Sequence, residues 1–118
     1  MAQASLDGID TDGGLKYEFS PGSKDEGEKE WWTMAEAVVG FFNSYQLDGN
    51  SVYLEKSLGM WEYLRKYFID LKNGEWFYRI DRNHMPVPTY AKVSLWKCPY
   101  HNSRMCLEMI RRIDEMRD

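Results

Sequence analysis

Residues 31–47, WWTMAEAVVGFFNSYQL, predict a helix that is apolar around most of its circumference. Along one side, apolar side chains recur at helical spacing: Trp31, Met34, Ala35, Val38, Phe42 and Tyr45. The opposite side is not cleanly polar, since it carries Trp32, Glu36, Val39, Gly40 and Asn43. A helix of this kind is packed on several sides. The turn residues at 48–50, Asp-Gly-Asn, end it.

Two further helices are expected on the C-terminal side of this segment. Residues 51–70 carry one apolar stripe: Leu54, Leu58, Trp61, Leu64 and Phe68. Asn73-Gly74 stops that helix, and residues 76–80 have the composition of a short strand. A last helix runs from near Pro99 to about Met116, because proline suits the first helical position. Its apolar face includes Cys106, Met109, Ile110 and Ile113.

The first thirty residues are mostly polar. Residues 1–6 resemble the last turns of a helix, and residues 15–19 alternate like a short strand. Residues 20–23 form a turn, and residues 24–30 are expected to be a charged, solvated loop. The chain is therefore mainly α, with about three helices and short β-strands in long loops.

Length and charge exclude several classes of protein. A chain of 118 residues is one domain at most, so residues 1–118 are treated as one unit. Its net charge of -4 and pI of about 5.2 lack the basic footprint of a nucleic-acid binder. The sequence has no apolar run long enough for a membrane span, and it has no signal-peptide pattern. We therefore expect no membrane partner. Two cysteines make no disulfide framework, which favours a cytoplasmic location.

Residues 96–102, WKCPYHN, are the most informative for chemistry. This run places His101 at the start of the last helix, and histidine acts as a base or an acid near neutral pH. Trp96 offers a flat apolar face on which sugar C–H groups stack. The alternative is a capping or packing histidine beside a buried tryptophan.

A second constellation lies at the start of the first long helix. Trp32 and Glu36 are four residues apart and share a helix face, whereas Trp31 points elsewhere. A stacking ring with a carboxylate one turn away can hold a hydroxylated ligand or orient a histidine. The alternative is two core tryptophans and a surface glutamate.

Other chemistry finds little support in the residues. His84 lies in an Asp-Arg-Asn-His turn and is expected to be exposed to solvent. Cys98 and Cys106 lack the close Cys or His pairs of a tetrahedral zinc site, so no metal is expected. The phosphate-loop, dinucleotide and nucleophile-elbow motifs are also missing.

Three runs together resemble the C-terminal part of the N-acylglucosamine 2-epimerase family, and most closely its cellobiose 2-epimerase branch. They are DGGLKYE at 12–18, EWWTMAE at 30–36 and WKCPYHNSR at 96–104, with NGEW at 73–76 between them. The similarity covers nearly the whole chain, and the WKCPYHN run is specific.

The resemblance implies an (α/α)6 barrel of six helical hairpins and reversible inversion at C2 of a reducing-end sugar. A histidine removes the C2 proton of the ring-opened mono- or disaccharide, and a second histidine returns a proton to the opposite face. No metal or redox cofactor is implied. Position by position, His101 matches a catalytic histidine, Glu36 a cleft carboxylate, and Trp32 and Trp96 sugar-stacking tryptophans.

The chain departs from the family in length. Six hairpins, each of two helices of about 12 residues and two connections of about 6, need at least about 216 residues. The 118 residues present cannot close the barrel, and the family's other catalytic histidine lies outside them. We therefore expect part of an epimerase that is inactive alone. The alternative is a carbohydrate-binding or structural helical module without catalysis.

The missing neighbours also predict self-association. Apolar surface around residues 31–47 is expected to be left open, because two other helices cannot cover it. We expect a two-fold dimer with the face that bears Trp31 in the contact.

Overall fold

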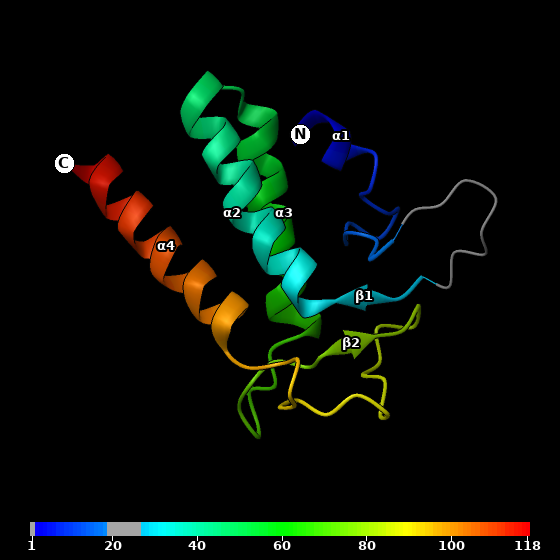
Figure 1. The fold of residues 1–118 in the computed structure, drawn as a ribbon. Coiled ribbons are helices and arrows are strands. Elements are labelled where there is room, and N and C mark those ends of the chain that lie inside the picture. The colour runs from blue at the N-terminus through cyan, green and yellow to red at the C-terminus, as the bar shows by residue number, and fades with distance from the viewer. Residues whose placement is uncertain (1, 19–26) are drawn as a thin grey trace.

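The computed structural model describes residues 2–18 and 27–118. Its elements in chain order are α1 (Ala2–Leu6), β1 (Lys29–Glu30), α2 (Trp31–Asp48), α3 (Ser51–Tyr67), β2 (Arg79–Ile80) and α4 (Tyr100–Arg117). Helices α2 and α3 form an antiparallel hairpin, and α4 packs against α2 (Figure 1). The mainly helical class is confirmed, and all three long helices were predicted from their periodicity.

Local signals account for the junction between α2 and α3. Gly49 adopts a left-handed conformation, with φ of 72°, and its N–H donates to the carbonyl of Tyr45 at 2.8 Å. Glycine takes this conformation without steric strain, which suits the end of a helix. The side chain of Asn50 then accepts from the N–H of Val52 at 3.0 Å and caps α3. The two helices are therefore joined by one tight turn.

Helix α3 ends three residues earlier than expected. After Tyr67 the chain bends, and Ile69 bridges to Trp76 in an antiparallel sense. The carboxylate of Asp70 accepts from the N–H groups of Lys72 and Asn73 at 3.0 and 3.1 Å, which makes a turn. Competition from such side-chain hydrogen bonds ends helices.

The strands are shorter than predicted. β1 and β2 pair antiparallel, with Lys29 opposite Ile80 and Glu30 opposite Arg79. Of the expected strand at 15–19, Leu15 forms an isolated bridge with Ile9, and the end of that strand lies outside the described residues. The same holds for the turn at 20–23 and for residues 24–26.

The expected solvated loop is wrong at its C-terminal end, because Lys29 and Glu30 are buried. The Lys29 ammonium group pairs with Asp10 at 3.0 Å and with Asp12 at 3.2 Å. Gly14 lies so close that an added Cβ would meet the Lys29 side chain at 2.6 Å. Partners from the N-terminal loop thus make burial of this charge possible.

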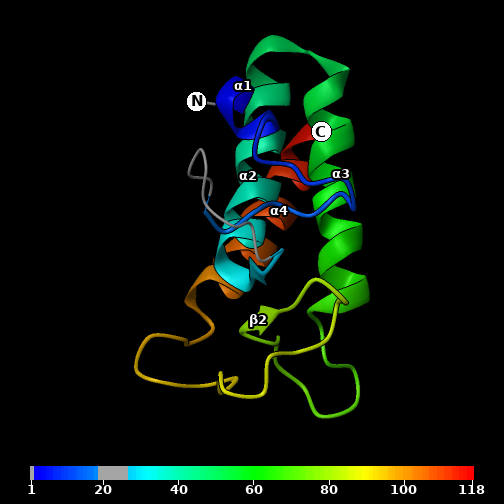
Figure 2. The ribbon, with the colours of Figure 1, turned by 90° about the vertical axis from the view of Figure 1, so that its right-hand side faces the viewer.

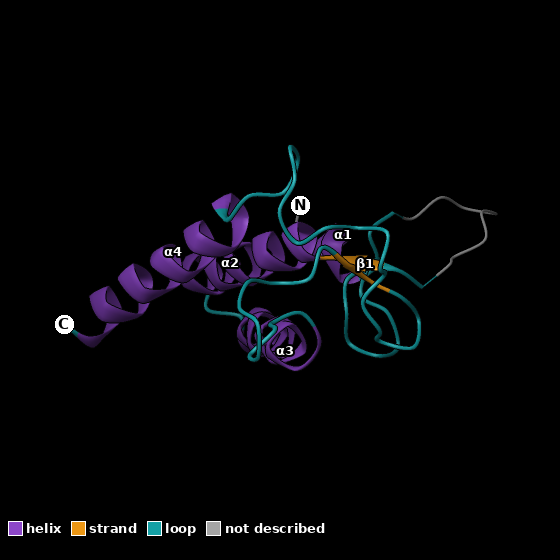
Figure 3. Cartoon of the chain, turned by 90° about the horizontal axis from the view of Figure 1, so that it is seen from below, coloured by secondary structure: helices purple, strands orange, loops and turns teal. Residues whose placement is uncertain are grey.

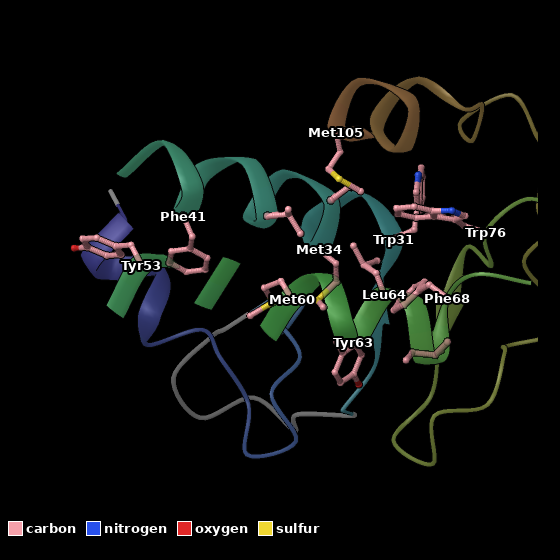
Figure 4. Packing of buried hydrophobic residues seen from close by; sticks show 13 residues of the cluster. Trp31, Met34, Phe41, Tyr53, Met60, Tyr63, Leu64, Phe68, Trp76 and Met105 are labelled. Carbon is pink, nitrogen blue, oxygen red and sulfur yellow. The ribbon is translucent and has the colours of Figure 1, made fainter. Parts of the chain in front are cut away.

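The core lies between α2 and α3 and continues into the segment after α3 (Figure 4). Trp31 and Trp76 lie near one end of it, and Phe41 stacks on Tyr53 at the other, with ring centroids 6.3 Å apart. The predicted stripe on α3 is partly wrong. Leu64 is fully buried, but Leu58 is 54% exposed. Buried positions of α3 are Tyr53, Ser57, Met60, Tyr63 and Leu64.

The predicted apolar face of α4 is only partly covered. Met105 is buried, whereas Ile110 and Ile113 are 59% and 45% exposed. This follows from the position of α4, which packs against α2 and not closely against α3 (Figure 3). An open apolar groove of about 290 Å³ lies between α3 and α4. Most of its lining consists of Val38, Leu58, Trp61, Met105, Cys106, Met109, Ile110 and Ile113.

The expectation of an exposed Trp31 face is wrong, since Trp31 is buried within the chain. Tyr78 packs edge-on against its ring at a centroid distance of 4.5 Å, and the Lys97 ammonium group lies 5.2 Å from the ring centroid. Residues on both sides of β2 therefore cover Trp31, and no neighbour from outside the chain is needed for this. No helix among the described residues is long and apolar enough to cross a membrane.

Candidate functional site

The start of α2 and the start of α4 meet at one end of the helices, where the loops around β2 also gather (Figure 2). Glu36 lies on the second turn of α2, and His101 lies on the first turn of α4. Nδ1 of His101 is 2.8 Å from Oε1 of Glu36. Both side chains are about one-third exposed, so the pair is accessible from solvent.

Arg104 completes this cluster one turn after His101. Its guanidinium group pairs with the same oxygen of Glu36, and its Nη1 donates to the hydroxyl of Tyr100 at 3.2 Å. Partial burial raises the pKa of Glu36, but Arg104 and His101 outweigh that effect and hold it below its ordinary value. Glu36 is therefore a carboxylate at neutral pH.

Trp32 brings an aromatic surface to the same place. Its ring lies one helical turn before Glu36, and its centroid is 5.7 Å from that of His101. The predicted constellation of Trp32, Glu36 and His101 thus comes together in space. Trp96 does not join it: its side chain is 81% exposed and makes no ring contact within the described part of the chain.

A groove of about 460 Å³ opens beside the cluster along α2. Trp32 and Glu36 line it, together with Phe41 and several small or polar residues of the same helix. Ala2, Ser5 and Leu15 line it from the N-terminal segment. The groove provides room for a hydroxylated ligand between a ring and a carboxylate.

The loop before α4 is anchored by Glu75, which holds the position of His101. Oε1 of Glu75 accepts from Nζ of Lys97 at 3.1 Å, from Nδ2 of Asn102 at 2.8 Å and from the N–H of Trp76 at 2.8 Å. Burial raises the pKa of Glu75, but these donors hold it below its ordinary value. Burial lowers the pKa of Lys97, and the ion pair with Glu75 opposes that change only in part.

Sequence reasoning missed Arg104 and Glu75 as parts of this arrangement. The signal for Arg104 was its spacing of three residues from His101, which places both on one face of the helix. Glu75 could not be found this way, because its partners are 22 and 27 residues away. It also has a φ of 61°, an uncommon conformation for a residue other than glycine.

The expectation that His84 is exposed holds only in part, since 28% of its side chain is accessible. Its ring stacks on Tyr67 with centroids 4.1 Å apart, and its Nε2 lies 2.8 Å from Oδ2 of Asp12. The turn at 81–84 folds over the end of α3, where Asp12 also accepts from the hydroxyl of Tyr63 at 2.8 Å. His84 therefore belongs to a structural cluster and makes no contact with Glu36 or Trp32 in the described residues.

Comparisons with known proteins agree on one family. The sequence model of the family described as N-acylglucosamine 2-epimerase (GlcNAc 2-epimerase) matches residues 1–102. The cellobiose 2-epimerase of Dictyoglomus turgidum is 48% identical over 84 residues, which are 70% of this chain and 21% of that protein. That of Ruminococcus albus is 43% identical over 102 residues, 86% of this chain and 26% of that protein. The chain spans about a quarter of the length of these curated relatives.

Solved structures show the same partial coverage. The cellobiose 2-epimerase from Spirochaeta thermophila superposes with a TM-score of 0.89 at 36% identity, over 99% of this chain and 30% of that chain. A sugar epimerase from a ruminal bacterium superposes with a TM-score of 0.86 at 38% identity, over 94% of this chain and 28% of that chain.

Proposed function

The chain belongs to the N-acylglucosamine 2-epimerase family, and from that premise we propose that it carries part of the active site of a sugar 2-epimerase. Its substrate class is a reducing-end aldose, such as the glucose unit of cellobiose. The observation that carries the proposal is the hydrogen-bonded pair of Glu36 and His101, with the Trp32 ring beside it. The proposal is supported by the superposition of this chain on 28% and 30% of two solved sugar epimerases, as one part of an (α/α)6 barrel.

In the proposed reaction His101 acts as a base on the ring-opened sugar. Glu36 accepts the Nδ1–H of the ring, which leaves the lone pair on Nε2. Nε2 removes the proton from C2, and the electrons of the C–H bond form a C1–C2 double bond. The aldehyde oxygen then carries the negative charge of a cis-enediolate. Return of a proton to the opposite face of C2 inverts that centre.

Glu36 and Arg104 would support His101 electrostatically. A carboxylate at 2.8 Å stabilises the imidazolium that forms when Nε2 takes the proton. Arg104 keeps Glu36 ionised, and it pairs with the same carboxylate oxygen that His101 contacts. We propose no role for a metal or a redox cofactor.

Inversion needs an acid or base group on each face of C2, and the chain contains only two histidines. His84 is bound to Asp12 and stacked on Tyr67, away from the candidate site. We therefore expect the 118-residue chain to produce no mannose-ended epimer from cellobiose. Anion-exchange chromatography of the sugar after prolonged incubation checks this. Turnover that persists through repeated purification would contradict it.

A second candidate function is carbohydrate binding without catalysis, which is favoured by the exposed Trp96 indole. Both candidates expect cellobiose to quench tryptophan fluorescence in a saturable way, with weaker binding in Trp32→Ala. They differ when the chain is joined to the N-terminal part of a related epimerase. Activity that depends on His101 favours the epimerase, and binding without activity favours the module.

We also propose that the chain forms a homodimer. Because Trp31 is buried, we place the contact at the α3–α4 groove and not at the face that bears Trp31. Leu58, Ile110 and Ile113 expose apolar surface along it, and such surface favours a partner. Light scattering is expected to give a mass that rises from 14.0 kDa toward twice that value with concentration. Ile110→Glu should hold the mass at the monomer value. A constant monomer mass for the unmodified chain would contradict the proposal.

A further inference from the structure

Glu30 is a buried carboxylate directly before α2, and both of its oxygens have partners. Oε2 accepts from Nε1 of Trp32 at 2.7 Å. Oε1 accepts from Nε of Arg79 at 3.0 Å and pairs with a second nitrogen of the same guanidinium group. A buried charge needs such partners, because its removal from water is otherwise very unfavourable.

The position of Glu30 would allow another role that it does not take. It is the N-cap residue of α2, where a side-chain oxygen usually accepts a free N–H of the first turn. The Glu30 side chain makes no such capping hydrogen bond. Its carboxylate points instead to the indole of Trp32 and to Arg79. Helix α2 therefore begins without a side-chain cap. The carboxylate of Glu30 instead binds the indole of Trp32, the second residue of the helix.

Arg79 holds Glu30 from the neighbouring strand. The two residues lie opposite each other in the β1–β2 pair. The guanidinium group of Arg79 also lies over the rings of Tyr90 and Tyr17, at 4.4 and 5.2 Å from the centroids. Tyr17 in turn meets Trp32 edge-on at 6.4 Å. The edge of the Trp32 ring thus rests on a network that comes from three separate segments.

The orientation of Trp32 matters because its ring lines the groove and lies beside His101. An indole has two free torsions, and a charge-assisted hydrogen bond at Nε1 restricts both. A ring held in one orientation binds a ligand without first losing conformational entropy.

We propose that Glu30 is a positioning residue that fixes the plane of the Trp32 indole at the sugar site. Its effect on sugar binding rests on the proposed function, whereas its effect on the indole does not. Glu30 acts through Trp32, because its carboxylate binds Trp32 and Arg79 and makes no hydrogen bond to His101 among the described residues.

The indole N–H of Trp32 gives a direct measurement of this role. In a ¹H–¹⁵N spectrum of the full chain, five tryptophans give five indole signals, and Trp32→Phe identifies one of them. In Glu30→Ala we expect that signal to move upfield and its exchange with solvent to quicken by about tenfold or more, as for a lost hydrogen bond to a charged group. The dissociation constant for cellobiose should rise by about tenfold.

Two further variants separate positioning from general stability. Glu28→Ala removes another partner of Arg79, at 2.8 Å, that has no hydrogen bond to Trp32, and it should leave the indole signal unchanged. In Glu30→Gln, one acceptor oxygen replaces the two carboxylate oxygens that Trp32 and Arg79 bind, so the indole signal should shift. This variant tests the proposal even if Glu30→Ala fails to fold. An unchanged Trp32 signal in the folded Gln variant would overturn the proposal. If the unmodified chain binds no cellobiose, the proposed function fails while the indole measurement still decides the role of Glu30.

Discussion

Replacing His101 with alanine is expected to lower the rate of C2 proton exchange by about 10²–10⁴-fold in a chain completed with the N-terminal part of a related epimerase. Among the described residues, only the His101 imidazole is both hydrogen-bonded to Glu36 through Nδ1 and beside the Trp32 ring. Its other ring nitrogen, Nε2, is left to act as the base. Its loss removes the proposed base and leaves Arg104 as the remaining partner of Glu36. The rate is measured as deuterium incorporation at C2 from D₂O, by NMR of the recovered sugar.

His84→Ala provides the matched control, since it removes the other histidine of the chain. His84 lies against Tyr67 and Asp12, so the exchange rate should change little if the thermal midpoint is retained. Full exchange in the His101 variant would show that His101 is not the base. Equal losses in both variants would point to a folding defect.

Leu64→Ala is expected to reduce the free energy of unfolding of the chain by about 2–5 kcal/mol. Leu64 is fully buried on α3 and packs in the core with Met34 and Phe68, which are also fully buried. Truncation removes apolar contacts and leaves a cavity that the surrounding helices fill only in part. Such a loss is a large part of the stability of a small domain. Urea unfolding followed by circular dichroism gives the value.

Leu58→Ala is the corresponding control on the same helix. Leu58 is 54% exposed at the edge of the α3–α4 groove, so its truncation should cost less than about 1 kcal/mol when measured at low protein concentration. The sequence alone placed both leucines in one stripe and predicts similar losses. Equal losses in the two variants would contradict the packing described above.

Local signals in the sequence determined the helices of this protein. The period of apolar residues predicted 31–47, 51–70 and a segment from near 99 to 116, and the structure has helices at 31–48, 51–67 and 100–117. Turn residues at 48–50 predicted the junction of α2 and α3. Motifs in the first and last of these helices also indicated the family and named Trp32, Glu36 and His101. These features depend on neighbours within a few residues, which a sequence shows directly.

Tertiary structure alone decided which charges are buried and what covers each apolar face. Glu30 and Lys29 looked like loop residues, but their partners Arg79 and Asp10 lie 49 and 19 residues away in the chain. Leu58 is exposed and Trp31 is covered. The physical reason is that periodicity shows which side of a helix is apolar, whereas burial depends on which distant segment packs against it.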